Sequence, residues 1–432
     1  MGMKDFTAGY AKMDITPHLG GRVVCLVTDL AADCLMDPLY VRAIALGHGD
    51  KAAVMFIIDN PGVGSKETLK WPQQLAKDLG LEENAVNFSS THTHTSASEG
   101  ADPEYRKFLY RRLLDAGFLA LKDRKPVTDV QWAEDRAEGM TFSRRYRMVD
   151  GTVETNPVRA EGKHVAPAAH FDDTMRVVRI MRENAKEIVL VNFQSHPDNV
   201  GNRSAYSADF PGLFCDYFEK SHEDVHCMYL NGAEGELITR GPKPYAKDHR
   251  YEWLMNYSKR LAEIASEIYP KTVSTNMTGL SYGQKTIYVK TKWDPDNMEE
   301  YERIYKLHCE RRYAEIHPSE RVAACIAANA GQQHWLNEYK EAERSIFLSA
   351  IHFCGLALAG ISGEPFSQVG IDVREGSPYP VTCVCCLTNG VRGYFPTAEA
   401  FEQGGYETFN TPVMKGSAEA ITEASIELLN SI

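Results

Sequence analysis

The chain has 432 residues, of which 43% are hydrophobic and 25% are charged, as in an ordinary globular protein. Its formal net charge of −12 argues against nucleic acid as a partner, because binding a phosphate backbone requires a basic face. The N-terminal residues lack the apolar segment of a secretory signal, and the longest apolar runs are too short to span a bilayer. We therefore expect a cytoplasmic, bacterial protein that uses neither nucleic acid nor a membrane as partner.

Short apolar runs bounded by turn residues alternate with amphipathic segments in the first part of the chain. These patterns predict strands at 40–46, 52–59 and 85–91, and helices at 66–80 and 103–124. Pro103 stands at the start of the second helix, where proline is tolerated. The stretch 127–169 is irregular and rich in arginine and glycine, and we interpret it as an excursion from the core.

The same alternation continues to the C-terminus. It predicts strands at 174–181, 187–196 and 225–231, a buried strand within 345–365, and another at 380–390. It also predicts helices at 208–222, 251–269, 297–316 and 416–431. We therefore predict an α/β fold: a single large domain over residues 1–432, with a mixed β-sheet flanked by helices and the functional site on loops at strand ends.

Two histidines follow the predicted strand at 85–91, in the stretch THTHT. His92 and His94 are two residues apart, and residues at this spacing in a strand point to the same face. The pair can therefore present two imidazoles to one metal site. The alternative is a polar strand end with two solvated histidines.

Other strand ends carry residues of the same chemistry. The strand at 187–196 ends at His196, Glu364 lies between glycine and proline in ISGEPFSQVG, and the loop NGAEGELITR comes at the end of the strand at 225–231. Tyr394 and Tyr406 lie among glycines further on. Each residue alone has an ordinary structural explanation. Together, histidines and a glutamate at strand ends form a ligand set that suits zinc, and their wide separation is typical of an enzyme site.

Several motifs then occur together in order: AGYAKMDITP, STHTHTSAS, NFQSHPDNV, SADFPG, NGAEGE, ISGEPFSQVG and NGVRGYFPTAEAFEQGGYE. Their order and approximate spacing resemble the catalytic N-terminal domain of the neutral/alkaline non-lysosomal ceramidases, from about Ala8 to near the C-terminus. The C-terminal β-sandwich domain of the secreted ceramidases is not expected here.

The resemblance implies particular roles for individual residues. It implies a Zn2+ ion, whose ligands are His92, His196, Glu364 and Tyr394. It also implies that Tyr406 lies by the substrate carbonyl and that His94 handles a proton beside the metal. Tyr406 and His94 are therefore the expected catalytic residues.

The sequence departs from the ceramidase pattern at the serine assigned to catalysis in that family. This position falls on Ile238, which cannot act as a nucleophile, and Thr239 is one residue away. Ceramide is therefore not the expected substrate. Either the metal-activated water attacks without help from a hydroxyl group, or the reaction differs.

Arginines in two segments indicate which kind of substrate could take the place of ceramide. FSRRYRMVDG contains Arg144, Arg145 and Arg147, and Arg240 ends the GELITR loop. Arginine pairs with carboxylates and phosphates, so these side chains favour an anionic substrate unless they form a solvated basic turn.

Two aspartates are further polar candidates. Asp198 is close enough to His196 in sequence to orient its ring, and Asp209 lies a little further along the chain. We assign substrate binding to Arg144, Arg240 and Asp198.

The predicted function is a zinc-dependent hydrolase that cleaves an amide or ester of a small soluble molecule. One alternative is a zinc-dependent lyase or isomerase that stabilises an enolate, with His94 or Tyr406 moving a proton. Another is a degenerate member of the family that binds metal or ligand without catalysis. The partner is a small-molecule substrate, and the half-buried helices leave room for a homo-oligomer.

Overall fold

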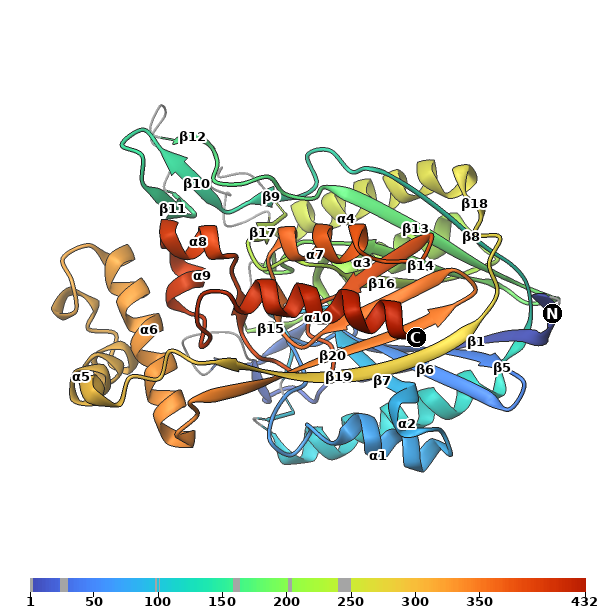
Figure 1. Ribbon diagram of the computed structural model, residues 1–432, viewed down its shortest axis with the longest axis horizontal. Helices are drawn as coiled ribbons and strands as arrows, with labels where there is room; N and C mark the ends of the chain where they lie inside the picture. The colour runs from blue at the N-terminus through green and yellow to red at the C-terminus, as the bar shows by residue number, and fades with distance from the viewer. Residues whose placement is uncertain are drawn as a thin grey trace.

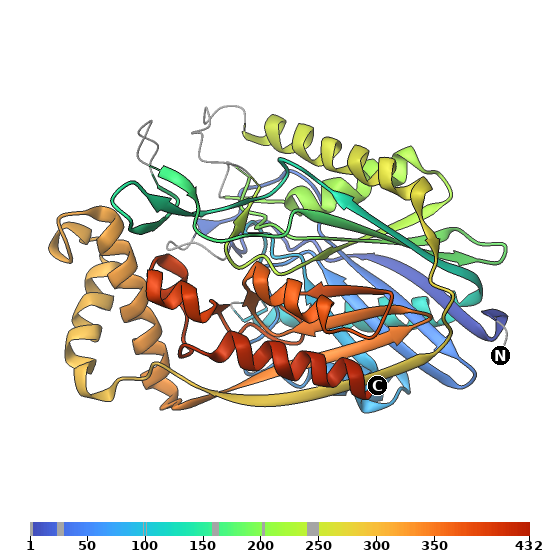
Figure 2. The same cartoon turned by 45° about the horizontal axis from the view of Figure 1, so that its top comes forward.

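The computed structural model describes residues 3–23, 30–97, 99–100, 102–157, 164–200, 204–239 and 250–432. Within these residues, a nine-stranded mixed sheet packs against a four-stranded sheet, and helices cover the outer faces of both (Figures 1 and 2). The order of the large sheet is β16-β14-β13-β8-β1-β5-β6-β7, with β18 paired to β8. The smaller sheet has the order β19-β20-β21-β23.

The strands of the large sheet are β1 (Phe6–Asp14), β5 (Tyr40–His48), β6 (Lys51–Ile58), β7 (Val86–Ser90), β8 (Lys125–Arg136), β13 (Thr174–Arg182), β14 (Glu187–Phe193), β16 (Val225–Asn231) and β18 (Val273–Ser274). Those of the smaller sheet are β19 (Leu280–Lys290), β20 (Glu343–Phe353), β21 (Leu356–Ile361) and β23 (Val381–Cys385). The short strands are β2 (Arg22–Val23), β3 (Leu30–Ala31), β4 (Cys34–Leu35), β9 (Phe142–Ser143), β10 (Arg145–Met148), β11 (Val153–Thr155), β12 (His164–Pro167), β15 (Ala205–Tyr206), β17 (Leu237–Ile238), β22 (Glu364–Pro365) and β24 (Tyr394–Phe395). The helices are α1 (Trp71–Leu79), α2 (Pro103–Lys122), α3 (Asp209–Ser221), α4 (Arg250–Ile268), α5 (Met298–Cys309), α6 (Glu320–Tyr339), α7 (Ser367–Glu375), α8 (Ala398–Gln403), α9 (Tyr406–Phe409) and α10 (Ser417–Ser431).

The strand β6 shows why both faces of the large sheet are buried. Met55 and Ile57 belong to the core between the two sheets, where Phe353 of the smaller sheet also packs. Phe56 and Ile58 point to the opposite face and pack in the core beneath α1 and α2. Since side chains alternate along a strand, a continuous apolar run supplies both cores.

The remaining helices cover the other outer faces. The helices α3 and α4 pack on the half of the large sheet that contains β13, β14 and β16. The helices α7 and α10 cover the four-stranded sheet (Figure 1). None of the helices in the described part of the chain combines the length and apolar character that crossing a bilayer requires.

The predicted α/β class with a mixed sheet flanked by helices is confirmed, but the interpretation of 127–169 as an excursion is wrong at its start. The strand β8 lies in the middle of the large sheet, between β13 and β1. Only Val127 and Val130 are fully buried along it, so β8 lacks the apolar run that marks its neighbours. The segment 345–365 contains a hairpin, β20–β21, instead of one strand. Its turn residues Cys354 and Gly355 both have positive φ angles, of 49° and 86°.

Three pairs of parallel strands, β6–β7, β14–β16 and β21–β23, end near one another. Asn231 ties the loops that follow them: its Nδ2 donates to the carbonyl oxygen of Thr91 at 3.1 Å, and its Oδ1 accepts from the backbone N–H of Ser195 at 3.3 Å. Its own carbonyl oxygen accepts from the N–H of Cys386 at 3.0 Å. Loops that are far apart in sequence therefore meet at one place.

Candidate metal centre

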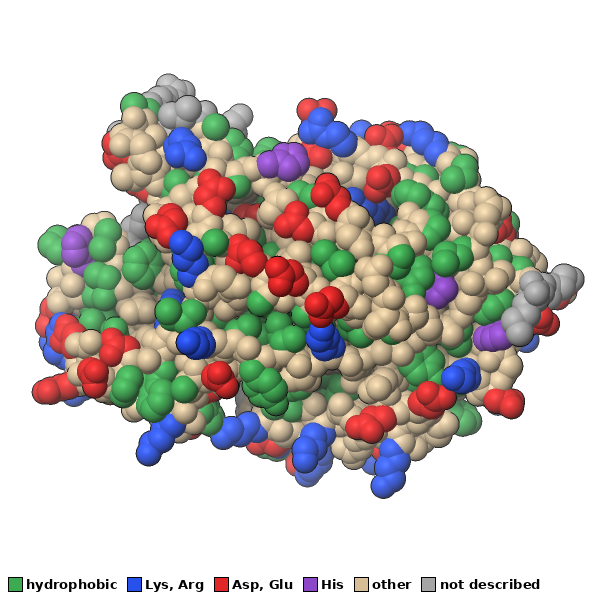
Figure 3. Space-filling model, viewed as in Figure 1, with side chains coloured by type: hydrophobic (Ala, Val, Ile, Leu, Met, Phe, Trp, Pro, Cys, Tyr) green, Lys and Arg blue, Asp and Glu red, His purple; other side chains and the backbone are tan. Residues whose placement is uncertain are grey.

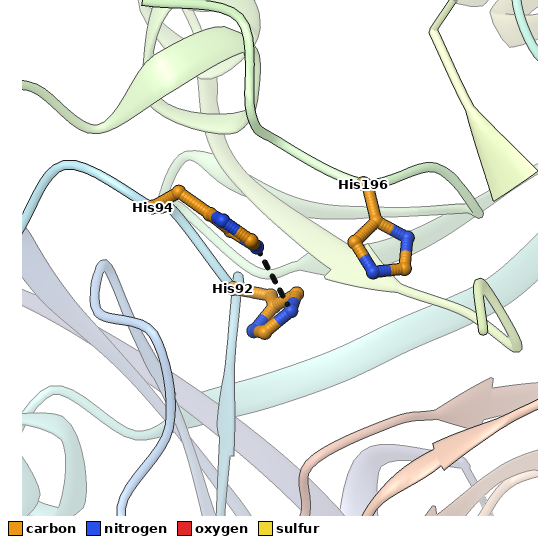
Figure 4. Close-up of side chains that lie close together, drawn as sticks. All are labelled: His92, His94 and His196. Atoms are coloured by element: carbon orange, nitrogen blue, oxygen red, sulfur yellow. Dashed lines mark hydrogen bonds between the residues drawn. The ribbon is translucent and has the colours of Figure 1, made fainter. Parts of the chain in front are cut away.

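Three imidazoles converge where these loops meet (Figure 4). His92 and His94 follow β7, and their Nε2 atoms are 3.2 Å apart. The ring of His196, which follows β14, lies 5.2 Å from that of His92 and 5.9 Å from that of His94, centre to centre. His92 and His196 are buried, and His94 is half-buried.

The backbone at His92 explains how two residues of one segment reach the same point. The strand β7 ends at Ser90, and His92 has a left-handed conformation with φ of 71°. Its N–H donates to the carbonyl oxygen of Asn60 at 3.0 Å. A turn, and not the regular alternation of a strand, therefore brings the two rings together. A non-glycine residue in this conformation is costly, by about 1–3 kcal/mol, and such strain is concentrated at functional sites.

Glu364 completes the cluster from β22, the short strand that follows β21. Its Oε2 is 3.2 Å from Nε2 of His196 and 3.4 Å from Nε2 of His92. Burial alone would raise the pKa of Glu364, but the two imidazoles outweigh burial and hold it well below its usual value. The carboxylate is therefore ionised and directed at two ring nitrogens.

The outer ring nitrogens are held by acceptors. Nδ1 of His92 lies 2.6 Å from the carbonyl oxygen of Pro61, which can only accept, so this nitrogen carries the proton. Nδ1 of His196 makes hydrogen bonds of 2.9 Å to the carbonyl oxygens of Glu234 and Leu237 and a close contact with the Glu234 carboxylate. Both Nε2 atoms thereby face the cluster, where each can offer a lone pair to a metal ion once it has lost its proton.

Glu234 belongs to the site but was not among the predicted site residues, although it lies in the NGAEGE loop. It holds the position beside His196 that was assigned to Asp198. Asp198 itself is exposed, and its assignment to substrate binding stays a prediction. Asp209 is buried and holds the loop after His196, accepting from the backbone N–H of Asn199 at 2.8 Å. Burial raises the pKa of Asp209 to about 6.

The three imidazoles of the cluster differ in pKa. Burial lowers the pKa of His196, but the Glu234 carboxylate outweighs this effect and raises it to about 9. The pKa of His92 is also raised, by Glu364 and Glu234 against burial. For His94, burial and the other two imidazoles all act to lower the pKa, so its ring is neutral at pH 7. Two buried carboxylates beside these rings require positive charge, which a metal ion or protons on the imidazoles can supply.

Tyr394 and Tyr406 extend the site on one side. The parallel pairing of β22 with β24 places Tyr394 opposite Glu364, and its ring centre is 6.2 Å from that of His196. The ring of Tyr406 is 6.1 Å from that of Tyr394. Burial, reinforced by Glu364 and opposed by Arg144, raises the pKa of the Tyr394 phenol. Tyr394 is thus next to the cluster as a neutral phenol, and its role as a ligand stays a prediction.

Of the predicted arginines, Arg144 borders the site. Its guanidinium carbon lies 5.4 Å from the ring centre of Tyr394 and 5.9 Å from that of Tyr406. The guanidinium also donates to Glu407 Oε1 at 2.6 Å and to the carbonyl oxygen of Gly235 at 2.7 Å. Glu407 therefore supplies counter-charge to Arg144, although it shares this charge with Arg145.

The other arginines do not join the cluster in the part of the chain that the structure describes. Arg145 donates to Glu407 Oε2 at 3.1 Å and to the carbonyl oxygen of Gly404 at 2.7 Å. Arg147 is exposed. Arg240, which we assigned to substrate binding, lies outside the described residues.

The loop that carries Ile238 lies against the cluster. Ile238 forms a backbone bridge with His196, so the position predicted for the family serine is close to a predicted ligand. The hydroxyl of Thr239 donates to Asn199 Oδ1 at 2.5 Å and is buried. Neither residue offers a free hydroxyl group to a substrate in this arrangement.

Buried imidazoles and a carboxylate at strand ends, between two packed sheets, define the class: an α/β protein with a candidate metal centre. Similar solved structures identify the fold. A neutral ceramidase from Pseudomonas aeruginosa matches with a TM-score of 0.73 and 14% identity over 98% of this chain and 74% of its own. A structure described as a ceramidase complexed with C2 matches with a TM-score of 0.69 and 13% identity, with the same coverage of both chains.

The chain therefore has the fold of the neutral ceramidases, as the sequence motifs indicate. No protein-family model matches the sequence. A search among curated proteins also finds no match. At 13–14% identity, the structural likeness establishes the fold and not the reaction.

Replacing Glu234 by glutamine is expected to weaken metal binding about 10- to 100-fold, because His196 loses the carboxylate that orients it and increases its basicity. Binding of Zn2+ to the purified protein, measured by competition with a chromophoric chelator, tests this. Glu236→Gln is the matched control: Glu236 is buried two residues away, but its carboxylate accepts from the backbone N–H of Ser367 at 3.0 Å. Equal affinities for the two variants would show that Glu234 does not act on the metal site.

Proposed function

We propose that this protein is a zinc-dependent hydrolase that cleaves an amide or ester bond of a small molecule. The observation that carries the proposal is the convergence of Nε2 of His92, Nε2 of His196 and Oε2 of Glu364, with both Nδ1 atoms held by acceptors on the far side. The structural neighbours are ceramidases, which are hydrolases. We further propose that residues 1–432 act as one catalytic domain on a small-molecule substrate.

The donor set fits zinc, which binds imidazole nitrogen and carboxylate oxygen and keeps one position open in catalytic sites. His92, His196 and Glu364 would hold the ion, and Tyr394 is the fourth ligand that the ceramidase motifs imply. When bound there, zinc supplies Lewis acidity and lowers the pKa of water toward neutrality.

The other side chains have separate tasks. His94 is neutral and its Nε2 points at the cluster, so it can take a proton from the attacking water and return it to the leaving group. Burial raises the pKa of Tyr406 to about 12, so its hydroxyl keeps its proton at pH 7 and can donate a hydrogen bond. Tyr406 and Arg144 lie together on one side, where they can stabilise negative charge on a carbonyl oxygen.

The first experiment is elemental analysis of protein purified without added metal, followed by assays with soluble amides and esters. We expect about one zinc ion per chain and turnover that a chelator abolishes and zinc restores. Reaction in 18O-labelled water should place one labelled oxygen in the carboxylate product, which a lyase or isomerase would not do. A chain that holds no zinc and binds none on titration would overturn the proposal.

A further inference from the structure

A cavity of about 430 Å3 opens beside the candidate metal centre. Arg144 and Tyr406, the two residues that border the centre, form part of its wall. The opposite walls come from β11 with the residue after it, from the first turns of α6, and from α9. The β10–β12 strands and the α5–α6 hairpin lie at the same end of the molecule, away from the N-terminus (Figures 1 and 3). The volume of the cavity suits part or all of a small-molecule ligand.

The wall formed by α6 is apolar. Val322, Cys325 and Ile326 all line the cavity, and their spacing of three and four residues places them on one face of the helix. Phe409 of α9 lines the cavity as well. Val322 is 41% exposed and Phe409 is 40% exposed. A bound apolar group would remove both side chains from water, which is favourable in proportion to the area covered.

The charged groups of the cavity do not favour an anion. Within the described residues, its charged lining consists of Arg144 and Glu154. The Arg144 guanidinium already donates to Glu407 at 2.6 Å, and Glu407 is fully buried directly behind it. A substrate carboxylate in this cavity would lose its hydration, would face the Glu154 carboxylate as well as Arg144, and would compete with Glu407 for the guanidinium.

We propose that the substrate carries a compact, uncharged apolar group that packs against Val322, Cys325 and Ile326 of α6. This inference rests on the proposed function and specifies its substrate class: an amide or ester whose carbonyl lies at the metal centre and whose apolar group fills the cavity. The helix α6 is then the element that determines specificity. The anionic substrate favoured by the arginines of the sequence is replaced by a neutral one.

The test uses a matched pair of amides of 7-amino-4-methylcoumarin, one with a hexanoyl group and one with an adipoyl group, which differ in a terminal methyl or carboxylate. Fluorescence anisotropy measures their binding to protein freed of metal by a chelator, so that no turnover occurs. We expect the hexanoyl amide to bind at least about tenfold more tightly, because it buries apolar surface without desolvating a charge. Equal or tighter binding of the adipoyl amide would overturn the inference.

The variant Val322→Lys tests the position of the binding site. It should weaken binding of the hexanoyl amide and strengthen binding of the adipoyl amide, so that the preference falls about tenfold or inverts. Val273→Lys is the control, because Val273 is also exposed (62%) but lies on β18, outside the cavity lining. If both variants leave the preference as in the wild type, α6 does not contact the ligand.

Two further measurements distinguish a compact apolar group from a lipid chain, and binding from hydrolysis. An N-hexadecanoyl amide in detergent micelles supplies the same apolar chemistry from a lipid source, and tighter binding of this amide than of the hexanoyl amide would contradict a compact group. Coumarin release by the zinc-loaded protein tests the reaction itself. Retained preference in binding without any release would refute the proposed hydrolase and leave the cavity assignment intact, whereas release from both short amides at equal rates would refute the assignment alone.

Discussion

Replacing His196 by alanine is expected to remove bound zinc almost completely and to abolish metal-dependent turnover. Carboxylates contact both nitrogens of the His196 ring: Nε2 lies 3.2 Å from Glu364 Oε2, and Nδ1 contacts Glu234. Its loss takes away one predicted ligand and leaves the buried Glu234 carboxylate without its imidazole partner. Zinc content by mass spectrometry and the metal-dependent rise in melting temperature should both fall to background.

The control for this substitution is His352→Ala. His352 is as buried as the cluster histidines, and its ring stacks on Tyr379 at 4.2 Å, in a different part of the structure. Both variants lose a packed imidazole and should lose stability, His196→Ala by more because it also leaves the Glu234 carboxylate without its partner. Only His196→Ala should lose zinc. Stoichiometric zinc in His196→Ala would mean that the metal, if present, is held elsewhere.

The sequence alone predicted the residues of the cluster well because each one directly follows an apolar strand. His92, His94, His196 and Glu364 were all identified in this way, and the structure brings all four together. The conformation that unites His92 and His94 could not be predicted, since a positive φ at a histidine depends on the surrounding turn and not on local preference. Glu234 was missed because a glutamate between alanine and glycine has no local mark of its contact with His196.

The sequence did not reveal the ion pairs of the two arginines. Arg144 and Arg145 were interpreted as contacts for an anionic substrate or as part of a solvated basic turn, and because the structure buries both, it excludes the solvated turn. Their partner Glu407 is 263 and 262 positions away. Such a pair is created only by the packing of β9–β10 against the α8–α9 segment, so local charge patterns could not reveal it. The same pairing supplies part of the counter-charge that an anionic substrate would otherwise provide.

Two elements of the fold were also not predicted from the sequence. The strand β8 was not predicted because it carries few fully buried side chains, and its place in the large sheet is set by pairing with β13 along its length. The helix α6 was also not predicted. Tertiary pairing decides β8, whereas α6 was overlooked although it is rich in alanine, which favours a helix. The helix α6 provides the apolar wall on which the substrate class depends.

Replacing Glu407 by glutamine is expected to destabilise the protein by about 3–5 kcal/mol at pH 7, since two buried guanidinium groups lose their counter-charge. Glu407 is fully buried and its two oxygens each accept from a different arginine, Arg144 at 2.6 Å and Arg145 at 3.1 Å. Urea unfolding followed by circular dichroism measures the loss. Glu402→Gln is the control: this exposed glutamate pairs with Lys415, 13 positions along the chain, and its replacement should change the free energy of unfolding little.

The pH dependence of this effect has a definite sign. Burial alone would raise the pKa of Glu407, but Arg144 and Arg145 outweigh burial and hold it below its usual value. A carboxyl group whose pKa is lower in the folded state stabilises the protein above its unfolded pKa, near 4.3, and loses this contribution as the pH falls through its folded pKa. The difference in stability between wild type and Glu407→Gln should therefore be full at pH 7 and shrink under strongly acidic conditions. A difference that stays constant down to the acid limit of folding would mean that lost packing, and not lost charge, causes the destabilisation. In that case Arg144 would keep its position beside Tyr394 and Tyr406 without the charge of Glu407.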